Sequence, residues 1–490
     1  MELRPTGRRL GGRRGPGASP GVAGPGDGAD SSSPARRGLG FFAVCLAYCA
    51  IIVDGSVLNV AIPTIRDHLG GSMSGAQWVL DGYTLPLAAL LLTAGALGDR
   101  IGLRRMLLGG IIVFTAASVA CASAPSVAWL IGARAAQGVG AAALLPATLA
   151  LVPHLFTRRA DRERATMAWV AAGSIAVAAG PLIGGLLIDA FGWRSIFLIN
   201  LPVGVVSAWL ARARVPETPR HRVPLDQAGQ AAAAAALGLL TAGLITGGAD
   251  GWGSPATLSM LAGGITAGLG FWIAERHSRH PLLPPSFLRQ QVRAAAVISA
   301  GLMGFVFYGT LFVLSLYFQQ LRSLSPGAAG IALLPLTASS IVGPLILYRP
   351  LARRYGHPVM LVAGFACCAA GTAALSAAGP HTPYLVALVG LLLTGGASTI
   401  AFSALTSLLM SATPAHQAGL GSGLQNTARQ AGALIAVSIL GSVLNTTLLA
   451  GRLPAAFLIL GIADIAGITL GLTTMRRQAA GQPPLATTAD

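Results

Sequence analysis

The stretch GALGDRIGLRR (Gly95–Arg105) directly follows a run of mostly apolar residues, AQWVLDGYTLPLAALLLTA (76–94). Gly98 and Gly102 suit a tight turn between two helices, since glycine adopts backbone conformations that other residues avoid. A long apolar helix that ends in a compact charged turn is typical of a segment that crosses a membrane and stops at its surface. The charged residues of the turn are Asp99, Arg100, Arg104 and Arg105.

The composition of the whole chain agrees with a membrane protein. Its 490 residues are 53% hydrophobic and only 10% charged, whereas soluble proteins are about 25% charged. The net charge of +17 does not predict a nucleic-acid partner, because all 33 basic residues are Arg in short clusters between apolar runs. The five cysteines also lie in apolar runs, and we expect them to be unpaired packing residues. No metal and no cofactor is predicted.

Fourteen apolar segments are long enough to cross the roughly 30 Å core of a bilayer as helices. Frequent Gly and Pro inside them fit this assignment, because membrane helices tolerate both. The sequence therefore predicts an all-α polytopic membrane protein. The segments are 39–61, 76–98, 106–123, 128–151, 166–190, 195–211, 228–247, 257–274, 295–318, 327–348, 359–378, 383–410, 419–445 and 453–475.

These segments divide the chain into two helical halves with flanking tails. Residues 1–38 are rich in Gly, Pro, Ser and Arg and cannot bury enough apolar surface to fold. The predicted organisation is a disordered cytoplasmic tail over 1–38, a six-helix bundle over 39–211, cytoplasmic linkers and an extra helix pair over 212–294, a second six-helix bundle over 295–475, and a cytoplasmic tail over 476–490.

The placement of the arginines predicts the orientation. With the N-terminus in the cytoplasm, 27 of the 33 arginines fall in cytoplasmic segments and four fall in outside loops. Such a bias follows the positive-inside rule for membrane proteins. We therefore expect a multi-pass protein of the cell membrane that has an even number of spans and both termini in the cytoplasm.

The charged turn resembles the best-known signature of the major facilitator superfamily, Gly-x-Leu-x-Asp-Arg-x-Gly-x-Arg-Arg after the second helix. Three further stretches resemble motifs of its fourteen-helix drug:proton antiporter family. GWRSIFLINLPVG (Gly192–Gly204) and NTARQ (Asn426–Gln430) also look like that family, and the resemblance covers about residues 39–477. The three motif stretches are VDGSVLNVAIP (Val53–Pro63), GARAAQGVGAA (Gly132–Ala142) and GSIAVAAGPLIGG (Gly173–Gly185).

The resemblance implies both a fold and a mechanism. Two six-helix bundles, related by a pseudo-twofold axis along the membrane normal, would enclose a cavity and rock to give alternating access. Asp99 would face the N-terminus of the helix that begins near Ala418, where a carboxylate is stabilised, and this contact would favour the outward-open state. The second half departs from the pattern, because Arg353 stands where its copy of the turn usually has an acid. The predicted gating residues are Asp99, Arg100, Gly102, Arg104 and Arg105, unless the turn serves only to anchor the helix ends.

Three charged residues lie well inside the predicted helices of the first half, namely Asp54, Asp81 and Arg134. At about 1.5 Å per residue they lie roughly 6, 9 and 8 Å outward of their helix midpoints, which predicts one cluster. Burial favours the neutral form of a carboxyl group and a nearby guanidinium favours the charged form. Movement of Asp54 relative to Arg134 would then load and release a proton, with a static ion pair as the alternative. For Asp81, a role in proton or substrate binding and simple pairing both stay open.

Other residues are candidates for contact with substrate or for setting the direction of transport. Arg429 is predicted to bind an anionic substrate group or to pair across the gate. For Asp464 in the last helix, a functional and a structural role both stay open. The substrate-binding candidates are Asp54, Asp81, Tyr83, Tyr308, Asn426 and Arg429, and the residues that match the exporter motif of the fifth helix are Gly173, Gly180, Pro181, Gly184 and Gly185.

The predicted function is proton-coupled efflux of amphipathic small molecules such as drugs, dyes or antibiotics, driven by the proton gradient. A dedicated exporter of a single metabolite or self-made antibiotic is the alternative, and a lipid-handling membrane protein is a more distant one. An enzyme is not predicted, because no Ser/His/Asp set stands out and the chain has no Lys for a phosphate-binding loop. The expected partners are a small-molecule substrate, protons and the lipid bilayer, and we expect a monomer.

Overall fold

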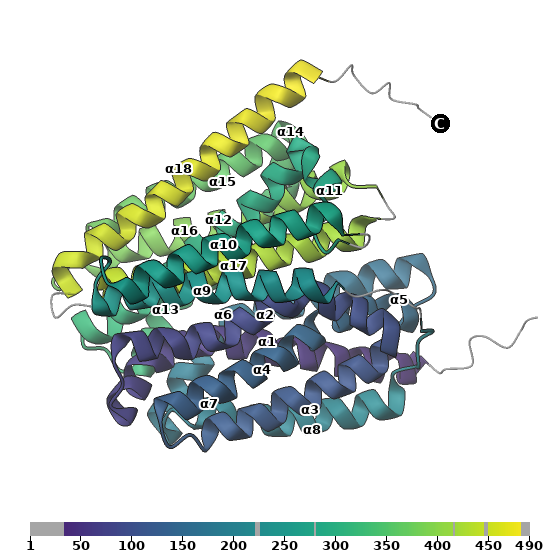
Figure 1. Cartoon of the computed structure of the whole chain (residues 1–490), viewed down its shortest axis with the longest axis horizontal. Helices are drawn as coiled ribbons and strands as arrows, with labels where there is room; N and C mark the ends of the chain where they lie inside the picture. The colour runs from purple at the N-terminus through teal and green to yellow at the C-terminus, as the bar shows by residue number, and fades with distance from the viewer. Residues whose placement is uncertain (1–33, 221–225, 279–280, 415–416, 445–448, 482–490) are drawn as a thin grey trace, which may run out of the picture.

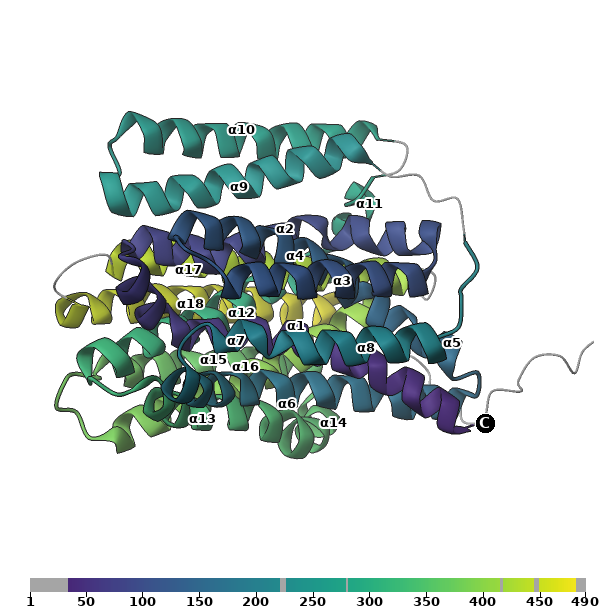
Figure 2. The same ribbon diagram turned by 90° about the horizontal axis from the view of Figure 1, so that it is seen from below.

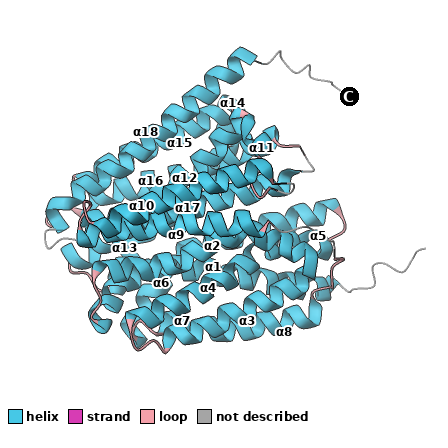
Figure 3. Ribbon diagram, viewed as in Figure 1, coloured by secondary structure: helices cyan, strands magenta, loops and turns pink. Residues whose placement is uncertain are grey.

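The computed structural model describes residues 34–220, 226–278, 281–414, 417–444 and 449–481. Within these ranges every regular element is a helix and no strand occurs (Figure 3). The predicted all-α fold is therefore confirmed.

The first half of the chain forms one bundle, drawn in purple and blue in the lower part of Figure 1. Its interior is apolar, with Leu58 and Ile62 of the first helix almost fully buried. Two short helices, α5 and α7, link longer ones. The elements are α1 (Pro34–Leu69), α2 (Met73–Ile101), α3 (Leu103–Ala122), α4 (Val127–Ala150), α5 (Val152–Leu155), α6 (Arg159–Phe191), α7 (Ser195–Leu198) and α8 (Asn200–Arg214).

The second half forms a matching bundle, drawn in green and yellow in the upper part of Figure 1. Two π-helical turns, Tyr317–Leu321 and Gly343–Tyr348, interrupt its helices. The elements are α11 (Pro285–Arg289), α12 (Gln291–Leu316), α13 (Pro326–Val342), α14 (Arg349–Tyr355), α15 (His357–Ser376), α16 (Tyr384–Ala412), α17 (Ala418–Leu444) and α18 (Leu449–Gly481).

The central pair, α9 (Gln227–Asp250) and α10 (Pro255–His277), lies outside both bundles as a separate layer (Figure 2). α9 packs against α2 of the first bundle and α17 of the second, whereas α10 packs mainly on α9. Gln230 donates a hydrogen bond to the Ala89 carbonyl of α2 at 2.7 Å. Ser442 of α17 donates to the Leu244 carbonyl at 2.6 Å. The pair therefore bridges the seam between the two halves.

The number of membrane spans agrees with the prediction. Thirteen of the described helices are long and apolar enough to cross a bilayer, or fourteen when Pro326–Val342 and Ile346–Tyr355, bent by 40°, count as one span. The bend coincides with a π-helical turn that contains Pro344, and both features kink helices. α1 begins and α18 ends at the same end of the molecule (Figure 1). This arrangement requires an even number of spans and so favours fourteen.

Parts of the two predicted tails are helical in the described residues, because the first helix begins earlier and the last helix ends later than predicted. α1 begins at Pro34, and α18 continues to Gly481. Proline suits the first turn of a helix, because the missing N–H would have no partner there. Residues 34–38 and 476–481 are thus helical, and the remainder of the two tails lies outside the described residues.

Candidate functional site

The charged turn after α2 has a defined backbone geometry. Gly102 ends α2 and precedes α3 with a φ of +98°, a conformation that costs glycine little. Its N–H donates to the Gly98 carbonyl at 2.9 Å. The N–H of Leu103 donates to the Thr218 hydroxyl at 2.8 Å. The linker that follows α8 therefore caps the start of α3.

The last turn of α8 and the same linker also hold one arginine of the turn. Arg104 donates to the Arg212 carbonyl at 2.5 Å and lies 3.5 Å from the Glu217 carboxylate. Arg100 and Arg105 are exposed, as residues that anchor the turn at a membrane surface would be. Sequence reasoning missed Thr218 and Glu217, since no local pattern connects them with a turn more than a hundred residues earlier.

A cavity of about 710 Å³ lies between the two halves. Its walls come mainly from α2 and α4 of the first half and α17 of the second, with single residues of α1, α3 and α6 and linker residues beside α9 and α10. It reaches the exposed residues Asp99 and Gly419 at the end of the molecule where α1 begins, and Arg429 also lines it. The molecule is therefore open between its halves at this end.

Asp99 lies at the mouth of this cavity, on the side opposite the start of α17. α17 begins at Ala418, as the sequence predicts for the helix that faces Asp99. Asp99 is exposed and makes no hydrogen bond or ion pair with any residue in the described ranges. A contact between Asp99 and α17 would need this mouth to close, so the gating role stays a prediction.

The other end of the molecule is closed by direct contacts between the halves. Gln77 of α2 donates to the carbonyls of Val437 and Ser438 of α17, at 3.1 and 2.8 Å. Ser315 of α12 donates to the Asn59 carbonyl of α1 at 2.6 Å. A cavity that is open at one end and closed at the other is one state of an alternating-access cycle.

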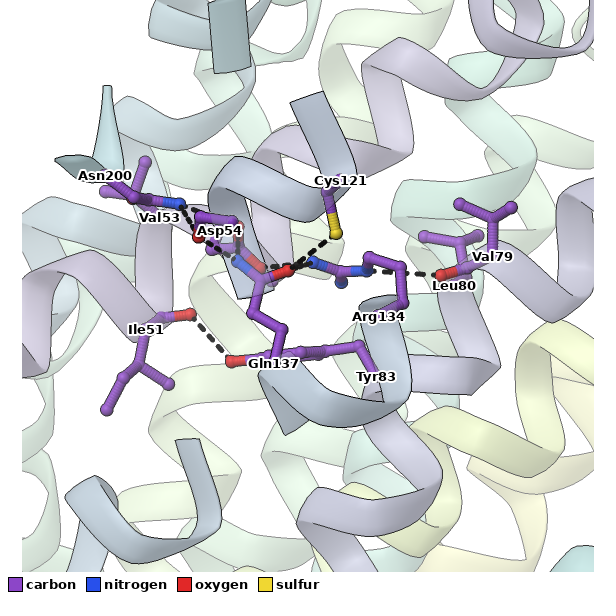
Figure 4. A network of polar contacts seen from close by, with 12 residues as sticks. Ile51, Val53, Asp54, Val79, Leu80, Tyr83, Cys121, Arg134, Gln137 and Asn200 are labelled. Carbon is purple, nitrogen blue, oxygen red and sulfur yellow. Dashed lines mark hydrogen bonds and ion pairs between the residues drawn. The ribbon is translucent and has the colours of Figure 1, made fainter. Parts of the chain in front are cut away.

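The centre of the first bundle holds a buried ion pair, which Figure 4 shows within its polar network. Arg134 of α4 lies 2.5 Å from the Asp54 carboxylate of α1, and their side chains are 1% and 0% exposed. The other carboxylate oxygen of Asp54 accepts from Gln137 at 2.7 Å and from Asn200 at 3.0 Å. The predicted pairing of Asp54 with Arg134 is thus present.

Polar partners from three further helices complete this network. The Ser118 hydroxyl of α3 accepts from Gln137 at 2.7 Å and from Asn200 of α8 at 3.2 Å. Arg134 also donates to the Val79 carbonyl of α2 at 3.3 Å. Ser118 and Asn200 were not predicted as site residues, although each is an isolated polar residue in an apolar run.

Two other buried carboxyl groups, those of Asp81 and Asp464, lie apart from this network. Asp81 accepts a hydrogen bond at 2.9 Å from Ser438 of the second half, and its other oxygen is buried with no described partner. The prediction of one three-residue cluster is wrong for Asp81, because equal depth does not place two side chains on the same helix face. Asp464 accepts a hydrogen bond from Thr372 at 3.2 Å within the second bundle. It does not line the large cavity between the two halves, and it does not line a smaller cavity that is described below.

Three glycines of the exporter motif place α6 close to α1. A Cβ atom at Gly180 would collide with the Ser56 hydroxyl, and one at Gly173 would collide with the ring of Tyr48. Gly184 also faces α1 at very short range. A side chain at any of these positions would therefore force Ser56, Tyr48 or Val57, or the helices themselves, to move.

The remaining motif residues face the second half of the molecule. A Cβ atom at Gly185 would collide with the Pro326 carbonyl of α13, and one at Gly330 of α13 would collide with the Pro181 carbonyl. The motif is therefore a close-packing face between α1 and α13. Whether it sets the direction of transport stays a prediction.

The predicted substrate residues Tyr83, Tyr308 and Arg429 line a second, smaller cavity of about 50 Å³ between the halves. The Tyr83 ring also stacks on the Arg134 guanidinium, 4.2 Å from its centre. Arg429 donates to the Tyr308 hydroxyl at 2.8 Å and lies 3.5 Å from the Asn426 amide oxygen. Tyr83 thus separates the buried ion pair from a space that the two halves share.

Two aromatic residues that the sequence did not single out line the large cavity. Tyr48 of α1 and Trp169 of α6 stack with ring centres 3.9 Å apart and an interplanar angle of 15°. Their contact joins distant parts of the chain, and neither residue stands in a recognisable pattern. They add a flat apolar surface to the wall.

Comparisons with known proteins identify the class to which this fold and cavity belong. The family model of the Major Facilitator Superfamily matches residues 44–437. The chain is 36% identical over 410 residues to the multidrug resistance protein Stp of Mycobacterium tuberculosis, which covers 83% of this chain and 74% of the relative. It is 32% identical over 401 residues to the tetracenomycin C resistance and export protein of Streptomyces glaucescens, over 81% of this chain and 74% of the relative.

The chain belongs to the Major Facilitator Superfamily. Among solved structures, a crystal structure of a peptide transporter in complex with sulfate matches 90% of this chain and 94% of that chain with a TM-score of 0.66. At 16% identity, this likeness supports the fold alone. The protein is a multi-pass membrane transporter, and it groups with the drug and antibiotic efflux transporters of its superfamily.

Proposed function

We propose that this protein exports amphipathic small molecules in exchange for protons, by alternating access between its two bundles. The buried Asp54–Arg134 pair is the observation that carries this proposal, because an ion pair inside a membrane protein is expensive and usually functional. The names of its relatives, which include multidrug resistance and antibiotic export, support small molecules as the cargo.

The contacts of Asp54 are those of an ionised carboxylate. It accepts from three N–H donors, on Arg134, Gln137 and Asn200, and an ionised carboxylate can only accept. In the proposed cycle, the state open at the end where α1 begins has already released its proton. Asp54 takes up a new proton when the opposite end opens.

Tyr83 connects the small cavity with the buried Asp54–Arg134 pair. Its ring covers the Arg134 guanidinium at 4.2 Å and also lines the small cavity beside Arg429. A substrate that pushes Tyr83 aside would disturb the partner of Asp54. Substrate binding and proton binding would then compete without sharing the same atoms.

The orientation and the gate belong to the same proposal. We take the open end as the cytoplasmic end, because the arginine-rich segments of the sequence cluster there. The turn at Asp99 would dock on the N-terminus of α17 when that end closes. The protein acts as a monomer in this scheme, since one chain holds both bundles, the cavity and the ion pair.

Asp54→Asn tests the proposal. The variant should bind dyes as the wild type does at alkaline pH but should lose transport driven by a pH gradient in proteoliposomes, because its side chain cannot exchange a proton. Asp464→Asn is a matched control, since Asp464 is also a buried acid but lies away from the cavities. Gradient-driven transport at the wild-type rate by Asp54→Asn would exclude Asp54 as the proton carrier.

A further inference from the structure

Arg429 is a cation without an anionic partner at the inner end of the large cavity. Its two terminal nitrogens contact Tyr308 and Asn426, whereas its Nε is buried and has no acceptor among the described residues. No described Asp or Glu lies within ion-pair distance of it. Arg134, which also lies deep within a membrane-spanning helix, is by contrast paired with Asp54 at 2.5 Å.

The acids among the described residues are not placed to receive a cationic group deep in the cavity. Asp54 and Asp81 are 1% and 0% exposed and line neither cavity. Asp99 and Asp226 line the large cavity, but Asp99 lies at its mouth and Asp226 caps α9, accepting from Gly229 N–H at 2.8 Å. The positive charge of Arg429 therefore lies deep in the cavity, whereas the negative charges of Asp99 and Asp226 lie near its entrance.

Two residues of the cavity wall also carry N–H donors without a partner in the described ranges. The indole N–H of Trp169 is buried without an acceptor among the described residues, as is the Nε of Arg429. Buried donors without partners are costly, so a bound molecule whose acceptor atoms reach either donor after the side chains shift would recover that cost. The stacked rings of Tyr48 and Trp169 add a flat surface beside them.

We propose that Arg429, Tyr308 and Asn426 form a subsite for an anionic group of the exported molecule, such as a carboxylate or a phenolate. The planar apolar part of that molecule lies against Tyr48 and Trp169. Arginine suits this task, because its planar guanidinium binds a carboxylate through two parallel hydrogen bonds. This inference rests on the proposed function and adds the charge class of its substrate.

The test compares two dyes of similar shape and opposite charge. Fluorescein is a flat xanthene dye that is anionic near neutral pH, and a rhodamine ester is a flat xanthene cation. Binding of each dye to the full-length protein in lipid nanodiscs is measured by fluorescence anisotropy. We expect the wild type to prefer fluorescein, and Arg429→Gln to weaken fluorescein binding about 10-fold or more while rhodamine binding is unchanged or tighter.

Two further variants separate charge recognition from misfolding. Arg429→Lys keeps the positive charge and should retain part of the preference for fluorescein, whereas Asp464→Asn, which removes a buried acid away from both cavities, should leave it unchanged. An equal loss of both dyes in Arg429→Gln, a wild type that prefers the cation, or a wild type that binds neither dye would overturn the subsite. Failure of the proposed function would appear separately, as a pH gradient that drives no dye of either charge in proteoliposomes.

Discussion

Arg134→Gln tests whether the buried ion pair is as closed to water as the structure indicates. Removal of one partner from a buried pair costs about 3–5 kcal/mol of the free energy of unfolding, because the other charge stays buried alone. Asp54 would keep its N–H donors on Gln137 and Asn200, at 2.7 and 3.0 Å. We therefore expect a loss near the lower limit, about 3 kcal/mol.

The loss is measured by denaturant unfolding in detergent micelles, followed by tryptophan fluorescence. The double variant Asp54→Asn with Arg134→Gln should regain about 2 kcal/mol of it, because no charge is left without a partner. A loss below about 1 kcal/mol, as for surface ion pairs, or simple additivity in the double variant, would refute the reasoning.

Three other changes probe the gate, the interface and the orientation. Asp99→Asn should keep expression and dye binding but lose export in an accumulation assay; normal export would mean that the turn only anchors the helices. Gly185→Val should keep α6 and α13 apart near Pro326, because the valine side chain has no room there. Cysteines placed at that end should then react with a thiol reagent faster than in the wild type. Unchanged reaction rates would disprove the tight fit. A cysteine at Gly71 should react with an impermeant thiol reagent applied outside cells and one at Thr157 should not, and the reverse pattern would invert the orientation.

The architecture was predictable because the bilayer imposes a simple rule on the sequence. Each span needs a long apolar run, and the runs, the glycine-rich turn at Gly102 and the placement of the arginines all reflect that rule. The pairing of Asp54 with Arg134 followed from depth alone, since few charges lie that far inside. These features depend only on depth along the membrane normal, and the position of a residue within its apolar run predicts that depth.

The contacts that the sequence did not predict depend on the rotation of each helix about its axis. The depth of a residue in the membrane does not determine that rotation. Asp81 has the predicted depth but points to Ser438 of the second half rather than to the ion pair. Asn200 reaches Asp54 across 146 positions of the chain, and the Tyr48–Trp169 stack joins α1 to α6. Such contacts arise from helix rotation and packing, so a single sequence contains no local signal for them.

The central claim is that movement of drug and movement of protons are one process, and proton flux during dye transport tests it most directly. Proteoliposomes in weak buffer, with equal pH on both sides, are given a steep gradient of fluorescein or the rhodamine ester, and a glass electrode follows the external pH. We predict that the wild type moves protons opposite to the dye and that Asp54→Asn moves none. Dye flux through the wild type without any change in pH would contradict the account.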